Sequence, residues 1–556
     1  MISRFCAKLR RTTGQVMTLQ QVLNHPTIEA QAALLSASLS TQKDGYSDIA
    51  AEHDGPLEMH HIAHVASNSV QFESIERLSQ EVLSPLGLAW DDVEDIVPMH
   101  GNLARILTCQ RPQSHNHRHA WLVRDSTVPD VASAIKKALT NHPIMRSMAI
   151  RPDHVGPLHV ILRPTDKFFF HCVRIVDPVE DSNALDYLEY NNLEVDYAAD
   201  PGPMYKVLVT EVKEENCLGI VWMSQHSTYD GISVPLFLED VDAALVAPNA
   251  KLTTRVPYTA WAKSYHNLRH SESAKGSISW NADRLSGISK QQNALFPFAR
   301  VPGMFKGNSD GWIDLSTGKP GPKREMLDDF DGARGFAQRA HLRDARQLKA
   351  DHGIEVPQIV RAALALLNCR RTGAGIALFG QHQAGRTWPF LSDWQASRMP
   401  EAMEVNGPTF ECLVTRISVV DELLVIKMLQ SLQDEQVLLN KHVHAPHDTM
   451  VREMNKREGN AGDVMEEVLR RQVFNWLPGG ALTWKRLQVV SMISRTDVGI
   501  LWNCSMPARD EVQVHASWDS AQLKKTEMDE LLKELVDLIE QLADRETWLK
   551  RVVDLK

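Results

Sequence analysis

The residues best suited to chemistry lie in one short segment, Val221 to Ser233. His226 stands at the end of an apolar run, and Asp230 and Gly231 follow it after three residues. The end of a strand is a rigid support, and the loop that follows it faces a cleft. A neutral imidazole placed there can take a proton from an amine or hydroxyl that attacks an acyl carbonyl. The segment therefore favours His226 as a general base.

The neighbours of His226 suggest supporting roles. Asp230 is expected to be architectural, because an aspartate in a tight turn meets local N–H groups first, and it could also pair with an arginine. Gly231 is expected to allow backbone dihedrals or a close approach that a side chain would forbid. Gln225 is interpreted as an orienting or spacing residue. Tyr229 is either a core aromatic or a wall of the cleft, and the sequence leaves both open.

Apolar periodicity predicts a mixed α and β chain on either side of this segment. Strands are expected at 119–124, 146–151, 158–163, 204–212, 218–223, 375–379, 410–420 and, as a pair, 497–517. Helices are expected at 76–86, 128–142, 234–245, 357–368, 421–440 and 526–542. The polar, Gly/Pro-rich interval 266–330 reads as a long connection between two lobes.

Composition excludes several classes of function. The 556 residues are 43% hydrophobic, which allows a large core, and the net charge of −10 argues against a nucleic-acid binder. Seven cysteines without CxxC pairs predict reduced thiols in an intracellular, cytoplasmic protein. A membrane span is not predicted, because no apolar stretch reaches about 18 residues. The absence of GxSxG, P-loop and GxGxxG motifs weighs against hydrolase, kinase and Rossmann interpretations.

Two groups of histidines resemble metal ligands in their spacing. Alternating residues of a strand share one face. We nevertheless expect solvent exposure and no metal, because the first group has no carboxylate near it in sequence, and the second group is interpreted in the same way. The two groups are His115, His117 and His119, and His442, His444 and His447.

The segment from Gln225 to Ser233 resembles the HHxxxDG signature of nonribosomal peptide synthetase condensation domains, with His226 as the second histidine. Gln225 replaces the first histidine, and such a replacement together with Tyr229 is similar to the fungal terminal, cyclising subtype. Further stretches resemble family motifs, occur in the family's order and extend the resemblance over about residues 76–545. They are Asp92–Pro98, Asn141–Arg146, Asp200–Met204, Pro257–Trp261, Gly385–Thr387 and Asn406–Thr409.

The resemblance also suggests which residues line a substrate tunnel. They are Tyr229, Ser233, His100, Arg386 and Asn406. Arg386 could instead pair with Asp230, and spacing cannot decide between the two. The chain departs from the family pattern at several positions. His100 and Leu103 replace the usual Thr and Gln, Ser147 replaces Thr, and the usual Asn is missing from Thr409-Phe410-Glu411.

The first 36 residues resemble the second half of a peptidyl carrier domain, and Met1 falls just after the position of the phosphopantetheine serine. The expected organisation is a helical carrier remnant at 1–36, a linker at 37–75, an N-terminal lobe at 76–265, the connection at 266–330 and a C-terminal lobe at 331–556.

The resemblance implies a two-lobed α/β fold like chloramphenicol acetyltransferase, with a mixed sheet flanked by helices in each lobe and a tunnel between the lobes. It implies an acyltransferase of secondary metabolism that makes an amide, less readily an ester, by attack of a small-molecule nucleophile on a thioester, and that could act in trans or release a cyclised product. No bound cofactor is expected. The acyl group would arrive on the phosphopantetheine arm of a separate acyl- or peptidyl-carrier protein, or as a soluble thioester such as CoA, and the protein is expected to be a monomer.

Two other functions stay open. One is an inactive condensation-like scaffold that binds a carrier or synthetase partner. The other is an acyl-CoA-dependent acyltransferase of the plant-type HxxxDG superfamily. The Asp-Phe-Gly-Trp-Gly signature of that group is absent, and Asp497-Val498-Gly499-Ile500 is the nearest stretch.

Overall fold

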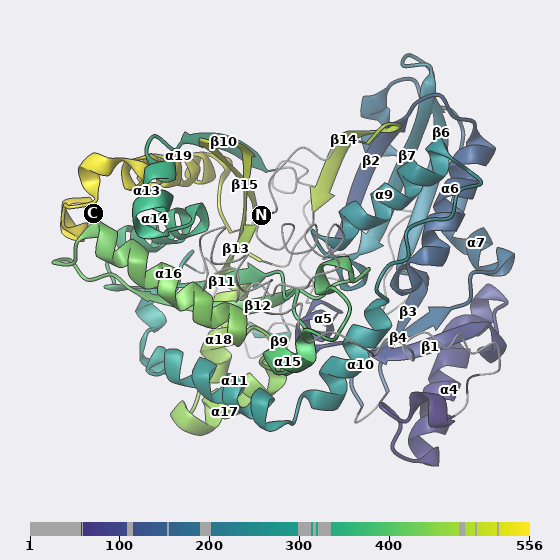
Figure 1. Ribbon diagram of the computed structural model, residues 1–556, viewed down its shortest axis with the longest axis horizontal. Helices are drawn as coiled ribbons and strands as arrows, with labels where there is room; N and C mark the ends of the chain where they lie inside the picture. Colours follow the sequence, from purple (N-terminus) through teal and green to yellow (C-terminus); the bar gives the residue numbers. More distant parts are fainter. Residues whose placement is uncertain are drawn as a thin grey trace, which may run out of the picture.

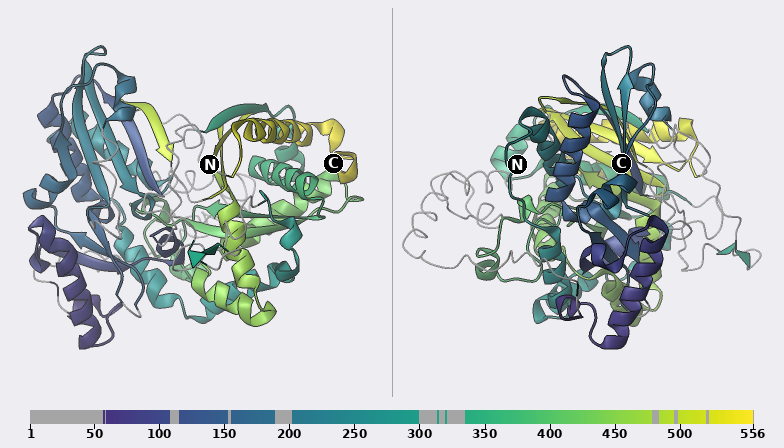
Figure 2. Two further views of the ribbon diagram at one scale, coloured as in Figure 1. Left: turned by 180° about the vertical axis from the view of Figure 1, so that it is seen from behind. Right: turned by 90° about the vertical axis from the view of Figure 1, so that its right-hand side faces the viewer.

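The computed structural model describes residues 57, 59–107, 115–152, 155–188, 202–298, 313–314, 319–320, 335–477, 484–494, 498–519 and 522–555. These residues form two lobes, which Figure 1 and Figure 2 show side by side. The first half of the chain builds one lobe and the second half builds the other, apart from one strand. The two-lobed fold with mixed sheets is thereby confirmed, whereas the predicted carrier remnant lies outside the described residues.

The N-terminal lobe is built on a five-stranded sheet with the order β14-β2-β7-β6-β5. Its strands are β14 (Leu487–Ser494), β2 (Asn116–Val123), β7 (Cys217–Gln225), β6 (Tyr205–Val212) and β5 (Val173–Ile175). β5 is parallel to β6, and the other pairs are antiparallel. Helices α6 (Val128–Asn141) and α9 (Ser233–Val246) pack against each other over this sheet. The buried strand β7 lies between β2 and β6 in this sheet.

A smaller sheet completes the N-terminal lobe. Its order is β1-β4-β3, with β1 (Val93–Pro98), β4 (Leu158–Leu162) and β3 (Ser147–Ile150) all antiparallel. Three further helices belong to this part of the chain, namely α4 (Ser69–Leu83), α5 (Gly101–Leu107) and α7 (Asp166–Cys172). α4 begins inside the interval 37–75 that was expected to be a linker. Its start is set by Asn68, whose side chain accepts a hydrogen bond from the N–H of Gln71.

The C-terminal lobe holds a six-stranded mixed sheet with the order β10-β16-β15-β13-β11-β12. The strands are β10 (Phe336–His341), β16 (Glu511–Trp518), β15 (Ile500–Ala508), β13 (Gln472–Trp476), β11 (Ile376–Gln383) and β12 (Glu411–Ser418). One apolar cluster joins one face of the sheet to α14 (Val356–Thr372), α16 (Val425–Lys441) and α19 (Lys525–Ala543). The other face packs on α11 (Glu272–Arg284), α17 (His447–Glu458) and α18 (Ala461–Arg471). Remaining short elements are α13 (Ala345–His352), α15 (Asp393–Ala396), and a hairpin of β8 (Ile313–Asp314) and β9 (Lys319–Pro320).

Two features of the connection between the lobes differ from the expectation. The interval 266–330 contains the end of α10 (Tyr258–Leu268) and all of α11, so it is not devoid of regular structure. Its buried apolar positions are too sparse for a clear periodic signal, since α11 buries Ala274, Ile278 and Ala282. In addition, β14 lies between β13 and β15 of the C-terminal lobe in sequence but pairs with β2 of the N-terminal lobe. The N-terminal sheet therefore includes a strand from the second half of the chain, and this pairing joins the two lobes.

Two expectations from composition concern the cysteines and membrane spans, and the structure gives the following for the described residues. Cys172, Cys217, Cys369, Cys412 and Cys504 are free thiols. No helix there is long and apolar enough to cross a membrane.

The chain passes closely over α10 at Gly407. A Cβ added there would lie 2.5 Å from Cβ of Tyr258, which is fully buried. We expect Gly407→Ala to lower the free energy of unfolding by about 1–3 kcal/mol, because a packed ring cannot move aside without strain. Gly276→Ala, in α11 with open space around it, should instead add about 0.5–1 kcal/mol. Urea unfolding checks both, and equal stability of Gly407→Ala and the parent would contradict this packing.

Candidate active site

His226 is placed by the central strand of the N-terminal sheet. β7 ends at Gln225, and His226 is the first residue of a single 3-10 turn, η6 (His226–Thr228). The backbone N–H of His226 donates to the carbonyl of His115 at 2.8 Å, which continues the pairing of β2 with β7. Four buried residues follow it, whereas His226 keeps partial exposure. The structure therefore presents this imidazole at a strand end while anchoring its backbone.

The side chain of Gln225 holds the turn and is 1% exposed. Its Oε1 accepts a hydrogen bond from the N–H of Ser227 at 2.5 Å, and the hydroxyl of Thr228 donates to its carbonyl at 2.8 Å. Gln225 thus fixes the spacing between the strand and the turn, and its amide is directed into the turn and away from the space around His226.

The orientation of the His226 ring determines which nitrogen is basic. Nδ1 lies 3.0 Å from the carbonyl oxygen of Tyr229. Because a carbonyl can only accept, Nδ1 carries the proton in the neutral ring, and Nε2 is the free base. The ring lies between two aromatic rings, Tyr229 at 5.0 Å and Phe410 at 4.6 Å between centroids, with interplanar angles of 25° and 21°. Tyr229 is thus a buried aromatic residue that also forms one wall beside the candidate base.

Burial keeps His226 in its basic form. Desolvation lowers the pKa of His226, and the Tyr229 carbonyl and the charge of Asp230 only partly oppose this. A lowered pKa means that the imidazole is neutral at pH 7, as a general base requires.

Asp230 forms the polar centre of the junction between the lobes. Its Oδ1 accepts from the backbone N–H groups of Ile232 at 3.0 Å and Ser233 at 2.8 Å and pairs with the guanidinium of Arg386. Its Oδ2 accepts from the N–H of Thr409 at 3.0 Å. Of the two roles considered for Arg386, the structure shows the pair with Asp230. Both side chains are almost fully buried, so their charges depend on each other.

Ser233 and Gly231 complete the turn in different ways. The hydroxyl of Ser233 accepts from the N–H of Asp230 at 2.8 Å, so it closes the turn that precedes α9, and Ser233 is fully buried. Gly231 has no positive φ, and a Cβ there would meet only Leu477, at 3.7 Å. The expectation that a glycine is required here by its backbone dihedrals or by close packing was therefore wrong. Gly231 is instead exposed.

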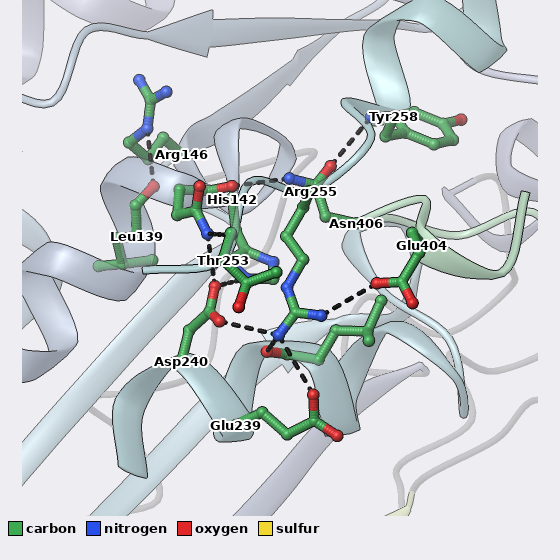
Figure 3. A network of polar contacts seen from close by, with 12 residues as sticks. Leu139, His142, Arg146, Glu239, Asp240, Thr253, Arg255, Tyr258, Glu404 and Asn406 are labelled. Carbon is green, nitrogen blue, oxygen red and sulfur yellow. Dashed lines mark hydrogen bonds and ion pairs between the residues drawn. The ribbon is translucent and has the colours of Figure 1, made fainter. Parts of the chain in front are cut away.

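Asn406 lies at a second polar contact between the lobes. Its Oδ1 accepts from the N–H of Tyr258 at 2.9 Å, and its Nδ2 donates to the carbonyl of Asn141 at 2.7 Å. Figure 3 shows it in the same network as Arg255, whose guanidinium binds Asp240 at 2.8 Å and Glu404 at 3.1 Å. Both ends of the Asn406 amide are used within the protein, and its predicted place in a tunnel stays a prediction.

His100 faces a buried acid. Its Nδ1 lies 3.4 Å from Oε1 of Glu411, and His444 approaches the same oxygen at 3.8 Å. All three side chains are at most 5% exposed. Burial raises the pKa of Glu411 well above its usual range and lowers the pKa of both His100 and His444 to about 3. His100 and Glu411, two positions at which the chain departs from the family pattern, thus lie close together at the lobe junction.

The alternating histidines were expected to be exposed, and this expectation was wrong. His119 is 3% exposed and stacks on Trp222 at 4.9 Å, while the ring of His117 lies 4.5 Å from that of His226. β2 is an inner strand, and seven of its eight residues are buried. In the second group, His444 is buried and the partly buried His447 pairs with Glu466. No group of three or more His, Cys, Asp or Glu residues in the described part of the chain could hold a metal ion.

Sequence reasoning missed three residues of this site. Phe410 stacks on His226, Thr409 bonds to Asp230, and His382 of β11 lies 5.4 Å from Phe410. All three come from the C-terminal lobe. A signal for the first two existed, because they directly follow Gly407-Pro408 of a stretch already singled out.

Solved structures of condensation domains share this architecture. The condensation domain of the Monacolin K polyketide synthase MokA is 13% identical with a TM-score of 0.62, and the match covers 83% of this chain and 100% of that one. The first condensation domain of the CDA synthetase is 12% identical with a TM-score of 0.57, covering 83% of this chain and 99% of that one. The chain has the condensation-domain fold. No family model matches it.

Relatives by sequence of this condensation-fold chain are fungal nonribosomal peptide synthetases. SIDD of Beauveria bassiana is 21% identical over 560 residues, which is 97% of this chain and 26% of that protein. The synthetase gloA of Glarea lozoyensis is 21% identical over 452 residues, which is 79% of this chain and 5% of that protein. The chain thus spans about a quarter or less of the length of these relatives.

The first prediction from the site concerns the pair of Asp230 and Arg386. Asp230→Asn should cost about 3–5 kcal/mol of unfolding free energy, since it leaves a buried guanidinium without its counter-charge. Glu81→Gln is the matched control, because it breaks the exposed pair of Arg77 and Glu81 and should cost less than about 0.5 kcal/mol. Urea unfolding measures both free energies. An equally small loss in the two variants would show that the pair of Asp230 and Arg386 does not stabilise the fold.

The second prediction is a pH dependence. A raised pKa in the folded state means that Glu411 binds its proton more tightly in the folded than in the unfolded chain. This tighter binding adds to the free energy of unfolding. The addition is fully present below the pKa of Glu411 in the unfolded chain, about 4.3, and it is lost as pH rises towards the pKa in the folded chain. The free energy of unfolding of Glu411→Gln should therefore rise relative to that of the parent as pH increases from about 5 to 7.5. The rise should be at most about 1.4 kcal/mol per pH unit. Urea unfolding at several pH values tests this, and a pH-independent difference would contradict it.

Proposed function

We propose that the protein is a condensation-type acyltransferase that joins an amine, or less readily a hydroxyl, to a thioester-bound acyl group. The proposal rests on the orientation, protonation and exposure of His226. Its Nδ1 is committed to a backbone carbonyl, burial favours the neutral ring, and the residue stays partly exposed where the two lobes meet. Nε2 is therefore a positioned base with access to a substrate.

The proposed reaction uses this one nitrogen. The amine nitrogen attacks the thioester carbonyl carbon while Nε2 of His226 takes its proton. The tetrahedral intermediate then collapses, the C–S bond breaks, and the sulfur leaves as a thiol after receiving a proton. Asp230 carries no proton in this scheme, because its oxygens already accept from three backbone N–H groups and from Arg386.

The relatives support a role in making secondary metabolites. We propose that the acyl group arrives on the phosphopantetheine arm of a carrier protein and that the nucleophile is a small molecule or the far end of the acyl chain itself. In the second case the product is a ring, which fits the resemblance to the terminal subtype based on Gln225 and Tyr229. Action in trans on a separate synthetase is part of this proposal.

A direct assay tests the proposal. The full chain is incubated with acyl-pantetheine, acyl-CoA or acylated carrier protein and a panel of amines, and amide is measured by mass spectrometry. Product from carrier or pantetheine thioesters supports the proposal. Product from acyl-CoA alone would favour the CoA-dependent class. A stable complex with loaded carrier and no product would favour an inactive scaffold.

His226→Ala should lower turnover by about 10²–10⁴-fold, because a positioned proton transfer is lost. Its melting temperature should stay within about 2 °C, since the ring is partly exposed and the backbone bonds remain. His341→Ala, at an exposed histidine of β10, is the control and should keep full activity. Full activity in His226→Ala would remove His226 from the mechanism.

A further inference from the structure

Glu411 meets two histidines in a buried contact at the lobe junction. Its Oε1 lies 3.4 Å from Nδ1 of His100, which stands between β1 and α5, and 3.8 Å from Nδ1 of His444, which follows α16. The side chains of His100, Glu411 and His444 are 1%, 4% and 5% exposed. Within the described residues, these three atoms make no hydrogen bond. Buried polar atoms that face one another need a hydrogen between them, because lone pairs alone repel.

The two imidazoles are acceptors rather than charged donors. Nε2 of His444 lies 2.9 Å from the hydroxyl oxygen of Thr387, so the nitrogen that has a partner is the one away from Glu411. Burial lowers the pKa of His100 and of His444 to about 3, and both rings are therefore neutral at neutral pH. A neutral imidazole has one nitrogen that accepts a hydrogen bond. A protonated carboxyl group beside these rings can supply the missing donor.

The surroundings of Glu411 oppose a negative charge on it. Burial raises the pKa of Glu411 well above its usual range, and the charge of Asp448 in α17 raises it further. Arg284 of α11 lines a small cavity together with Glu411, but its guanidinium approaches Glu435 at 3.5 Å and donates to the carbonyl of Val414 at 2.7 Å. The charge of Arg284 is thus already committed. An ionised Glu411 would be a costly buried charge.

The remaining titratable groups that face or act on Glu411 do not change this balance. Burial raises the pKa of the two tyrosines and of the thiol, which keeps all three neutral, and the histidine on the cavity wall already pairs with Glu466. These groups are Tyr258 and Tyr265 of α10, Cys412 beside Glu411, and His447 of α17.

The residues just before Glu411 belong to the active site. Phe410 stacks on His226 at 4.6 Å, and the N–H of Thr409 donates to Asp230 at 3.0 Å. Glu411 is the first residue of β12, where this segment enters the C-terminal sheet. A movement of the Glu411 carboxyl group would carry Phe410 and Thr409 with it. The protonation of Glu411 is therefore coupled to the position of the proposed base.

We propose that Glu411 is a positioning residue for acyl transfer, held as a neutral carboxylic acid whose O–H is directed at the Nδ1 atoms of His100 and His444. This inference deepens the proposed function and rests on it for the kinetic test. When Glu411 loses its proton to water, the carboxylate and the facing lone pairs repel, and the carboxylate moves towards solvent. Phe410 moves with it, so His226 loses one of the two rings between which it lies. Acyl transfer is therefore expected to fail as pH rises through the pKa of Glu411.

The first test detects the carboxyl proton and needs no substrate. In the infrared spectrum of the full chain at neutral pH, Glu411→Gln should lose intensity relative to the parent in the C=O stretching band of protonated carboxyl groups. Glu466→Gln is the matched control and should leave that band unchanged. Its partial burial is outweighed by the pairing with His447, and the pKa of Glu466 falls to about 2. Equal band intensity in Glu411→Gln and the parent would show a carboxylate at Glu411 and overturn the proposal.

The second test follows acyl transfer against pH, with acyl-pantetheine and an amine that the parent accepts. Above the pKa of Glu411, kcat of the parent should fall about tenfold per pH unit, and the infrared band should disappear with the same midpoint. Glu411→Gln should lack this alkaline fall, because its amide keeps an N–H donor and does not ionise. Glu411→Leu has no donor and should lower kcat about 10–100-fold at neutral pH, with little change in KM.

The outcomes separate this inference from the proposed function. An alkaline fall of equal size in the parent and in Glu411→Gln would refute the role of Glu411, even where His226→Ala has lost its activity. Full activity in His226→Ala would refute the proposed function and leave the infrared result standing. If Glu411→Gln does not fold, the parent alone decides, because a carboxyl band and a kcat that fall at different pH values would contradict the proposal.

Discussion

The buried carboxylate of Asp230 is the constraint on which the rest of the site depends. A charge in the interior must be paired and hydrogen-bonded, and the partners of Asp230 come from both lobes. Ile232 and Ser233 belong to its own turn, while Arg386 and Thr409 belong to the C-terminal lobe. The turn that presents His226 therefore reaches its final form only when the lobes are docked.

The same C-terminal segment also orients the base. Thr409 binds Asp230, and the next residue, Phe410, stacks on His226 opposite Tyr229. Just before them, Asn406 and Glu404 connect this segment to α6 and to Arg255. Because Arg386 also binds the carbonyls of Val405 and Gly407, the segment has little freedom to shift independently of the N-terminal lobe. A small movement between the lobes would move the wall against which His226 packs.

The sequence alone predicts many elements of the fold and the position of the candidate base. The features that it does not predict share one physical cause. Local patterns were sufficient for the strand that ends at Gln225, for the helix that starts at Ser233 and for His226 as the candidate base. What the sequence could not reveal depends on pairing across hundreds of residues. β14 joins the N-terminal sheet from within the sequence of the C-terminal lobe. β2 thereby becomes an inner strand, and His119 on it is buried. A periodic pattern records which face of an element is apolar but does not identify the element that covers it.

These contacts determine which charged and neutral groups surround His226. Its permanent charges, Asp230 and Arg386, neutralise each other at the lobe junction, and the rings in contact with His226 are those of His117, Tyr229 and Phe410. Neutral rings cost little to bury, so the resting site is stable and the base stays unprotonated.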